Sequence, residues 1–189
     1  GALQYDAAFD SSSAQTLSLL TELRHAVEHH ELRLYLQPKV PLHGQPGLAA
    51  EALVRWQHPQ RGLVPPMQFI PFAEQTGFVR HLTLWMFEEV ARLLADPRTQ
   101  GLPLRVSVNL STRDLLDPEL SHRLADILVR HGVPASAFCL EITESAIMDD
   151  PQRAEAMLNR LSEQGFKLSI DDFRTGYSSL AYLKRLPVD

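Results

Sequence analysis

The sequence contains little cysteine, no long apolar run and no excess of positive charge. Cys139 is the single cysteine of the 189 residues, so an internal disulfide is impossible and a reducing compartment, the cytoplasm, is expected. No stretch approaches the roughly 18 apolar residues of a membrane span, and no signal peptide is recognisable, so we expect no membrane contact by this chain. The formal net charge of −5 argues against binding a nucleic-acid duplex through its phosphates.

Apolar residues are plentiful enough for one folded domain. They make up 44% of the chain, which suffices for a sizeable core. Strand-like segments lie at 32–40, 47–56, 102–111, 137–145 and 166–173, and helical patterns lie at 67–95, 113–131, 151–164 and 178–186. Because parallel strands need crossover connections that helices supply, this order predicts a mainly parallel α/β sheet.

The N-terminal part has a different character. Residues 1–13 are small and polar and are interpreted as a linker. Residues 14–31 carry Leu17, Leu20, Leu23 and Val27 at helical spacing, which predicts an amphipathic lead-in helix. The main domain is expected to span residues 32–189.

Alternation within the strands separates an apolar face from a polar one, since successive side chains point to opposite sides of a sheet. Ser107 and Asn109 alternate with valines and a leucine, and Ser169 and Asp171 alternate in the same way with Leu168 and an isoleucine. The other three strands repeat this design. In a closed parallel barrel, the C-terminal ends of the strands meet at one mouth, where active sites lie.

Five oxygen-bearing residues end four of these strands: Glu51, Asn109, Glu141, Asp171 and Asp172. Such a cluster would repel itself without a cation, and carboxylate and amide oxygens are the ligands that Mg²⁺ and Mn²⁺ prefer. Adjacent aspartates suit a two-metal centre, because one carboxylate can bridge two ions. The alternative is that strand ends are polar only because they meet solvent. The residues alone therefore indicate a metal-dependent barrel enzyme.

Several separated motifs resemble those of EAL-domain cyclic-di-GMP phosphodiesterases. The segment Glu51-Ala52-Leu53-Val54-Arg55-Trp56 is similar to the family signature. It stands in register with Gln37-Pro38, Asn109-Leu110-Ser111, Glu141-Ile142-Thr143-Glu144 and Asp171-Asp172-Phe173. The resemblance runs from about Leu23 to the last residue. It implies a TIM-type (β/α)8 barrel of the EAL type whose first strand is antiparallel.

The same resemblance implies hydrolysis of cyclic-di-GMP to linear pGpG with two Mg²⁺ or Mn²⁺ ions. One ion would be held by Glu51, Asn109, Glu141 and Asp171, and the second by Asp171 and Asp172. Glu51, Asp171 and Asp172 would thus be the catalytic set.

The resemblance also implies roles outside the metal site. Gln37 and Arg55 would contact the substrate, and the planar fork of an arginine suits phosphate oxygens. A surface salt bridge is the alternative for Arg55. Glu144 would steady the loop after the double aspartate, or it would simply be a carboxylate at a helix N-terminus.

Two departures from the family pattern affect these expectations. The chain ends before the positions where the family has a further lysine and glutamate, so we expect an incomplete barrel, with slow or no turnover. An open barrel exposes strand edges, which predicts a homodimer, an element-exchanged oligomer, or a chain trimmed from a longer protein. The other departure is Arg174, which stands where the family usually has a glycine and puts the role of that loop in doubt.

Three functional readings remain open from the sequence. The chain is a phosphodiesterase, a catalytically incompetent module that binds cyclic-di-GMP or dimerises, or an unrelated metal-dependent barrel hydrolase. The lead-in helix resembles the connector after a GGDEF domain, so an upstream GGDEF or sensor domain is expected in the parent protein. The histidines show no metal-ligand spacing and are interpreted as mostly solvated. Cys139 and Trp56 are interpreted as core residues.

Overall fold

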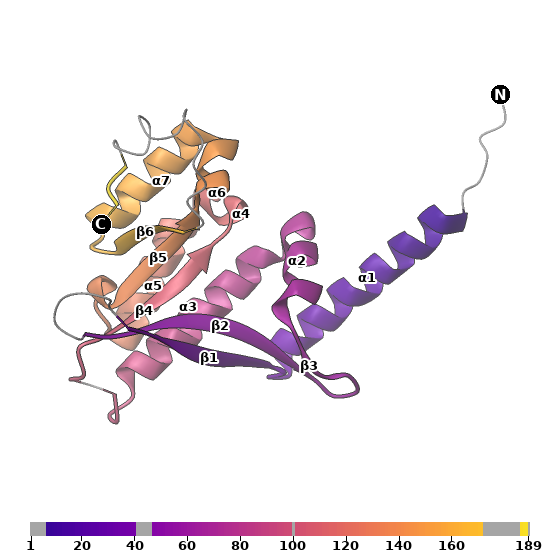
Figure 1. Ribbon diagram of the computed structural model, residues 1–189, viewed down its shortest axis with the longest axis horizontal. Coiled ribbons are helices and arrows are strands. Elements are labelled where there is room, and N and C mark those ends of the chain that lie inside the picture. The colour runs from indigo at the N-terminus through magenta and orange to yellow at the C-terminus, as the bar shows by residue number, and fades with distance from the viewer. Residues whose placement is uncertain (1–6, 41–46, 100, 172–185, 189) are drawn as a thin grey trace. The chain divides into compact units, whose positions relative to one another are not determined.

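The computed structural model describes residues 7–40, 47–99, 101–171 and 186–188. The chain divides into two compact units. Their helices and strands are labelled in Figure 1. The first unit comprises Gly1–Arg33 and Val54–Phe78, and the second comprises Leu34–Leu53 and Val79–Asp189. Two long strands, β1 (Leu32–Lys39) and β2 (Leu48–His58), each run from one unit into the other.

The first unit contains the helices α1 (Ala7–Glu28) and α2 (Ile70–Thr76), the short strand β3 (Gly62–Val64) and the 3-10 turn η1 (Pro66–Gln68). Its core includes Leu23, Trp56 and Phe69, all fully buried. The indole Nε1 of Trp56 donates a hydrogen bond to Glu31 Oε2 at 3.0 Å, and its ring meets Phe69 edge-on with the centroids 5.6 Å apart. Trp56 is thus a core residue, as predicted, and its polar atom is satisfied.

The lead-in helix starts earlier than the sequence suggested. Helix α1 begins at Ala7, so residues 7–13, predicted as a linker, are helical. This segment contains no glycine or proline, and alanine has the highest helix propensity, so its small polar residues did not exclude a helix. Residues 1–6 lie outside the described residues.

One histidine of the first unit differs from the predicted solvated position. His58 is only 8% exposed. Its Nδ1 accepts hydrogen bonds from the backbone N–H groups of Gln60 and Arg61 at 3.1 and 3.2 Å, and its Nε2 lies 3.4 Å from Glu22 Oε2. Since Nδ1 is an acceptor, the ring proton belongs on Nε2, facing the carboxylate. His58 therefore anchors the turn between β2 and β3.

The second unit is built on a parallel sheet, as the alternating pattern predicted. The strands follow the order β1-β2-β4-β5-β6, with β4 (Leu104–Leu110), β5 (Phe138–Thr143) and β6 (Lys167–Asp171). From β2 onward the neighbours in this order are parallel, whereas β1 is antiparallel to β2. The five predicted strands are all present. The sequence missed β3, which pairs with β2 as a short antiparallel hairpin.

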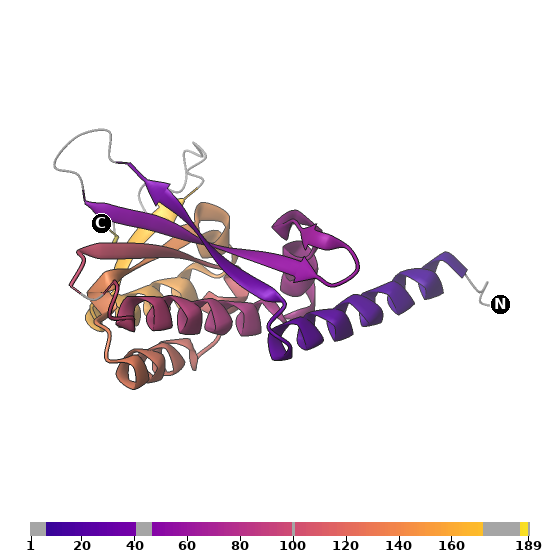
Figure 2. The ribbon, with the colours of Figure 1, turned by 90° about the horizontal axis from the view of Figure 1, so that it is seen from below.

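Helices cover the apolar face of the strands β4 to β6. Figure 2 shows α3 (Val79–Ala95) and α5 (Leu120–His131) on one side of these strands, and α7 (Pro151–Glu163) connects to α5 and β6 by packing contacts. Val106, Leu140 and Leu168 point to this side and are fully buried. The rings of Phe87 and Phe138 stack with their centroids 5.2 Å apart. Burial of these aromatic and aliphatic groups holds the layers together.

Two helical patterns that looked continuous are broken. The pattern at 67–95 is divided at Gly77, whose φ of 76° only glycine adopts easily, into α2 and α3. The pattern at 113–131 is divided into α4 (Thr112–Leu115) and α5, with Pro118 between them. The structure also adds α6 (Glu144–Asp149) and the 3-10 turn η2 (Ala135–Ala137). The helix predicted at 178–186 falls almost wholly outside the described residues. Within the described ranges, no helix is both long and apolar enough to cross a membrane.

Candidate functional site

The register of the parallel strands places the predicted site residues on one face of the sheet. Asn109 of β4 is the direct neighbour of Glu141 on β5, and Thr143 is the neighbour of Asp171 on β6. On the other side of β4, Glu51 of β2 is paired with Ser107. Register partners in parallel strands point the same way. The face opposite the helices is therefore the polar one, as alternation predicted.

Three of the predicted oxygen donors come together on this face. Asn109 Nδ2 donates a hydrogen bond to Glu51 Oε1 at 2.9 Å, which joins two strands 58 residues apart in sequence. Glu141 lies directly beside Asn109 on the next strand and is 7% exposed. We call Glu51, Asn109 and Glu141 the oxygen cluster. Its members come from three different strands, so only the folded sheet assembles it.

A lysine that the sequence analysis did not single out enters the same site. Lys39, the last residue of β1, donates hydrogen bonds from Nζ to Glu141 Oε1 and, at 3.2 Å, to Ser107 Oγ. A signal was available, because Lys39 stands two residues after Gln37 and so shares its face of the strand. The pattern alone could not show that this face reaches β5.

The reach of Lys39 requires the sheet of the second unit to curl. Three neighbour steps separate β1 from β5 in the sheet order. In a flat sheet these steps would amount to about 14 Å at roughly 4.8 Å each, which exceeds the length of a lysine side chain. The contact between Lys39 and Glu141 therefore brings the polar face inward, as the interior of a barrel wall requires.

Three other predicted site residues lie on β1, β2 and β6. Asp171 is exposed at the C-terminal end of β6, two residues beyond Ser169, the register neighbour of Glu141. Gln37 is exposed on β1. Arg55 belongs to the first unit, where its Nη1 donates to the carbonyl oxygen of Val54 at 2.9 Å. Asp172 and Arg174 lie outside the described residues, and so does the loop that Glu144 was expected to steady.

Glu144 occupies the first turn of helix α6. The N-cap of this helix is Thr143, whose hydroxyl accepts a hydrogen bond from the backbone N–H of Ala146 at 3.2 Å. A carboxylate in the first turn interacts favourably with the helix dipole. Glu144 therefore lies at a helix N-terminus, as the simpler of its two interpretations predicted.

The oxygen cluster offers ligands of the kind that divalent cations bind. Among the described residues, no group of three or more His, Cys, Asp or Glu side chains is close enough to hold a metal ion. Asn109 offers an amide oxygen, which is not among these four side-chain types, and Asp172 lies outside the described residues. The donors that do converge are hard oxygens, and a positive charge, the Lys39 ammonium, already lies against one of them. This chemistry fits magnesium or manganese better than a soft-ligand metal.

Cys139 does not occupy the core position that was expected. It is half-buried and shares the polar face with Ser107, its register neighbour. Burial, followed by the nearby charge of Glu141, raises the pKa of its thiol. The thiol is therefore kept protonated at neutral pH, and a protonated thiol is a poor metal ligand.

The turn after β4 is fixed by a buried carboxyl. Ser111, two residues beyond Asn109, donates to Asp114 Oδ2 from its backbone N–H at 2.8 Å and from its hydroxyl at 2.6 Å. Thr83 Oγ1 of α3 donates to the same oxygen at 3.0 Å. Asp114 is 1% exposed, and burial raises the pKa of its carboxyl. Among the described residues, its Oδ1 has no hydrogen-bond partner.

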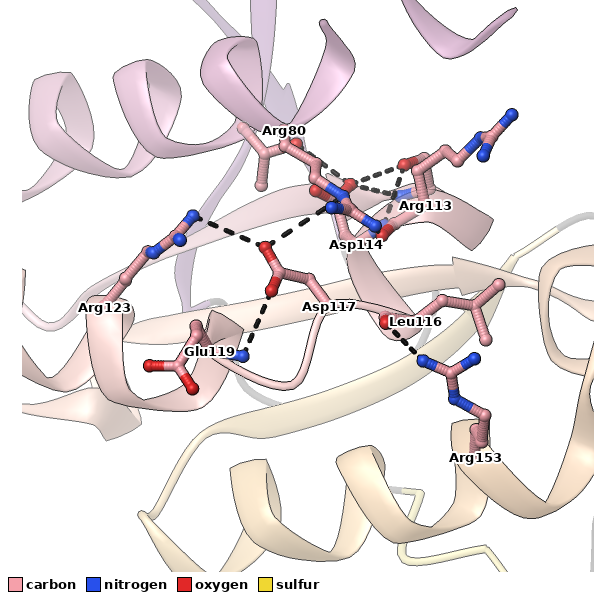
Figure 3. Close-up of polar contacts among 10 residues, drawn as sticks. Arg80, Arg113, Asp114, Leu116, Asp117, Glu119, Arg123 and Arg153 are labelled. Atoms are coloured by element: carbon pink, nitrogen blue, oxygen red, sulfur yellow. Dashed lines mark hydrogen bonds and ion pairs between the residues drawn. The ribbon is translucent and has the colours of Figure 1, made fainter. Parts of the chain in front are cut away.

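Arginines surround the next part of this turn (Figure 3). Asp117 Oδ2 lies 3.4 Å from Arg123 Nη1 and 4.0 Å from Arg80 Nε. Arg153 of α7 donates to the carbonyl oxygen of Leu116 at 2.7 Å. The turn that carries the end of β4 is thus tied to α3, α5 and α7, which holds Asn109 on a rigid support.

A cavity lies at the other end of the same strands. It has a volume of about 400 Å³, and Leu48, Leu102 and Leu104 are among its lining residues. Leu48 and Leu104 begin β2 and β4 and Leu102 lies just before β4, whereas Asn109 stands near the end of β4. The cavity is therefore separate from the oxygen cluster.

Comparisons with known proteins agree on one family. The family model described as the EAL domain matches residues 20–189. The bifunctional diguanylate cyclase/cyclic di-GMP phosphodiesterase MucR of Pseudomonas aeruginosa is 40% identical over 184 residues, which cover 97% of this chain and 27% of MucR. The cyclic di-GMP phosphodiesterase PdeR of Escherichia coli is 39% identical over 173 residues, which cover 92% of this chain and 26% of PdeR. The chain thus spans about a quarter of the length of these relatives.

A solved structure shows the same fold. The cyclic-di-GMP complex of the PaMucR phosphodiesterase matches with a TM-score of 0.83 at 42% identity, covering 90% of this chain and 70% of that one. Together with the mixed sheet, this match confirms the predicted fold class: an incomplete α/β barrel whose first strand is antiparallel.

Proposed function

The chain belongs to the EAL domain family, and from this premise we propose that it hydrolyses cyclic-di-GMP to linear pGpG in second-messenger signalling. Two relatives about 40% identical to it are named as cyclic-di-GMP phosphodiesterases. A similar solved structure holds cyclic-di-GMP. These names support the substrate class, because the matched segments cover nearly all of this chain.

The observation that carries the proposal is the hydrogen bond between Asn109 and Glu51 beside the buried Glu141. A pure scaffold has no need to gather two carboxylates on one face of a sheet, because like charges repel each other. A phosphodiesterase needs this arrangement to hold cations next to a phosphate. The oxygen cluster is therefore best explained as one half of a metal centre.

The proposed metal centre uses Mg²⁺ or Mn²⁺. Glu51, Asn109, Glu141 and Asp171 would hold one ion, and Asp171 with Asp172 would hold a second. When bound, such ions activate a water molecule and stabilise the attacking and leaving oxygens of a phosphoryl displacement.

The protein's own residues act by orienting these donors. Asn109 fixes the carboxylate of Glu51 through its amide N–H, and the network of Ser111 and Asp114 holds the end of β4 in place. Gln37 and Arg55 are proposed to contact the substrate, where the guanidinium can pair with two phosphate oxygens. Glu144 is proposed to support the loop after Asp172.

We propose three further properties of the chain. The chain associates with a second copy of itself, acts beside a GGDEF or sensor domain, and works in the cytoplasm. The bifunctional name of MucR supports the second of these, because it joins a cyclase and a phosphodiesterase in one protein. The single cysteine supports the third.

A paired assay tests the function. Cyclic-di-GMP hydrolysis is followed with Mg²⁺ or Mn²⁺, and cyclic-di-GMP binding is measured by calorimetry with Ca²⁺. We expect slow turnover that falls at least about 100-fold in Glu51→Ala, because a ligand of the proposed metal centre is lost. Glu163→Ala, an equal change at an exposed position on α7, should retain the original rate.

The other outcomes are equally informative. Binding without turnover would reject hydrolysis and identify a recognition module for cyclic-di-GMP. Absence of both binding and turnover would reject the proposed ligand as well.

A further inference from the structure

Glu141 is the most deeply buried member of the oxygen cluster, and its contact in the structure is with an ammonium group. Lys39 Nζ lies against Glu141 Oε1 and donates to Ser107 Oγ at 3.2 Å. The Glu141 side chain is 8% exposed and that of Lys39 is 37% exposed. The charged end of the lysine is thus inside the site, while part of its stem remains in solvent.

The position of Lys39 allows its ammonium group to leave Glu141. It is the last residue of β1, and the next residue, Val40, is 83% exposed. Within the described part of the chain, the ammonium contacts only Glu141 and Ser107. A long lysine side chain with one end near solvent can turn outward without moving the strand.

Lys39 and a divalent ion cannot both bind the carboxylate of Glu141 without repelling each other. A buried carboxylate needs a counter-charge, and the ammonium supplies one. A divalent ion on the same carboxylate would stand close to that ammonium, and the two like charges would repel each other. Binding of the ion therefore requires Lys39 to withdraw, and this requirement weakens the observed affinity.

We propose that Lys39 is a displaceable internal cation that competes with the divalent metal for Glu141 and thereby sets the metal affinity of the oxygen cluster. This inference rests on the proposed metal-dependent function and adds a residue to it. It assigns Lys39 a role in tuning the site, with no part in the reaction itself.

Metal binding measured without substrate tests this role. Mn²⁺ is titrated into the original chain and into Lys39→Gln, with free Mn²⁺ followed by electron paramagnetic resonance. We expect Lys39→Gln to bind Mn²⁺ at least about tenfold more tightly, since the competing charge is gone. The matched control is Arg160→Gln, which removes one positive charge from an exposed position on α7 and should change the affinity less than about twofold.

A second variant separates charge from shape. Lys39→Arg keeps the positive charge and should keep the weaker affinity of the original chain. Tight Mn²⁺ binding by Lys39→Arg would overturn the proposal, because the charge would then not be the cause. Circular dichroism of each variant verifies that the fold is retained.

The remaining outcomes distinguish this inference from the function on which it rests. If the original chain and Lys39→Gln bind Mn²⁺ equally, or Lys39→Gln binds it more weakly, the competition is wrong and the metal centre stands. If neither binds Mn²⁺, the proposed metal centre fails and the competition fails with it.

Discussion

Two buried carboxyl groups of the second unit are held in opposite ways. Asp114 is 1% exposed and Glu141 is 7% exposed. Asp114 receives neutral donors, the backbone and hydroxyl of Ser111 and the hydroxyl of Thr83. Glu141 instead contacts the ammonium of Lys39. Similar burial therefore comes with a neutral network in one case and a charged partner in the other.

The difference separates a structural carboxyl from one available for ligand binding. The donors around Asp114 belong to the backbone and side chains of a capping box and of α3, and exchanging them would break the turn. The partner of Glu141 is a flexible cation, and another cation can replace it. The comparison predicts that mutations at the two sites affect different properties.

The largest expected effect is on metal binding at Glu141. Glu141→Gln should lower the Mn²⁺ affinity at least about 100-fold, equivalent to roughly 3 kcal/mol, because an anionic ligand becomes neutral. Calorimetric titration measures this change. Asp114→Asn is the matched control and should leave the affinity within about threefold; equal losses in both variants would erase the distinction.

The second effect is on stability at Asp114. Asp114→Ala should lower the free energy of unfolding by about 2–4 kcal/mol, since a helix cap is lost and the buried hydroxyl of Thr83 loses its acceptor. Urea denaturation measures it, with the exposed Asp149→Ala as a control. A loss below about 0.5 kcal/mol for Asp114→Ala would show that the network is not structural.

The sequence predicts part of the difference between Asp114 and Glu141. Alternation placed Asn109 and Glu141 on the polar face, because a strand allows only two directions for its side chains. The capping box at Ser111 and Asp114 was also readable from spacing and was overlooked. Lys39 could not be assigned to Glu141, because strand alternation does not determine how far a sheet curls.

Segment ends were harder to predict for physical reasons. The break at Gly77 depends on a left-handed backbone angle that glycine permits but does not require. Helix α1 extends through serines that have only intermediate helix propensity, so composition suggested a linker. The metal-ligand and substrate roles of Glu51, Arg55, Asp171 and the others stay predictions.

The smallest expected effect is a pH dependence at Asp114. Burial raises the pKa of its folded-state carboxyl above the ordinary value of 3.8, so the folded state holds this proton more tightly than the unfolded state does. Its contribution to stability is fully present below pH 3.8 and is lost as the pH rises through the folded-state pKa. The slope is at most about 1.4 kcal/mol per pH unit.

Urea denaturation of the original chain and of Asp114→Asn across pH 4–7 checks this sign. The stability of the original chain relative to Asp114→Asn should decrease as the pH rises. Parallel profiles would mean that the folded-state carboxyl titrates as it does in the unfolded chain.

The most direct test of the metal centre is a double-mutant cycle on Mn²⁺ affinity with Glu51→Gln and Glu141→Gln. These residues stand on β2 and β5, which are separated by β4 in the sheet. If both bind one ion, either mutation alone should remove most of the affinity, and the double mutant should be little worse than the single ones. Unchanged Mn²⁺ affinity in either single variant would contradict a metal ion shared between these strands.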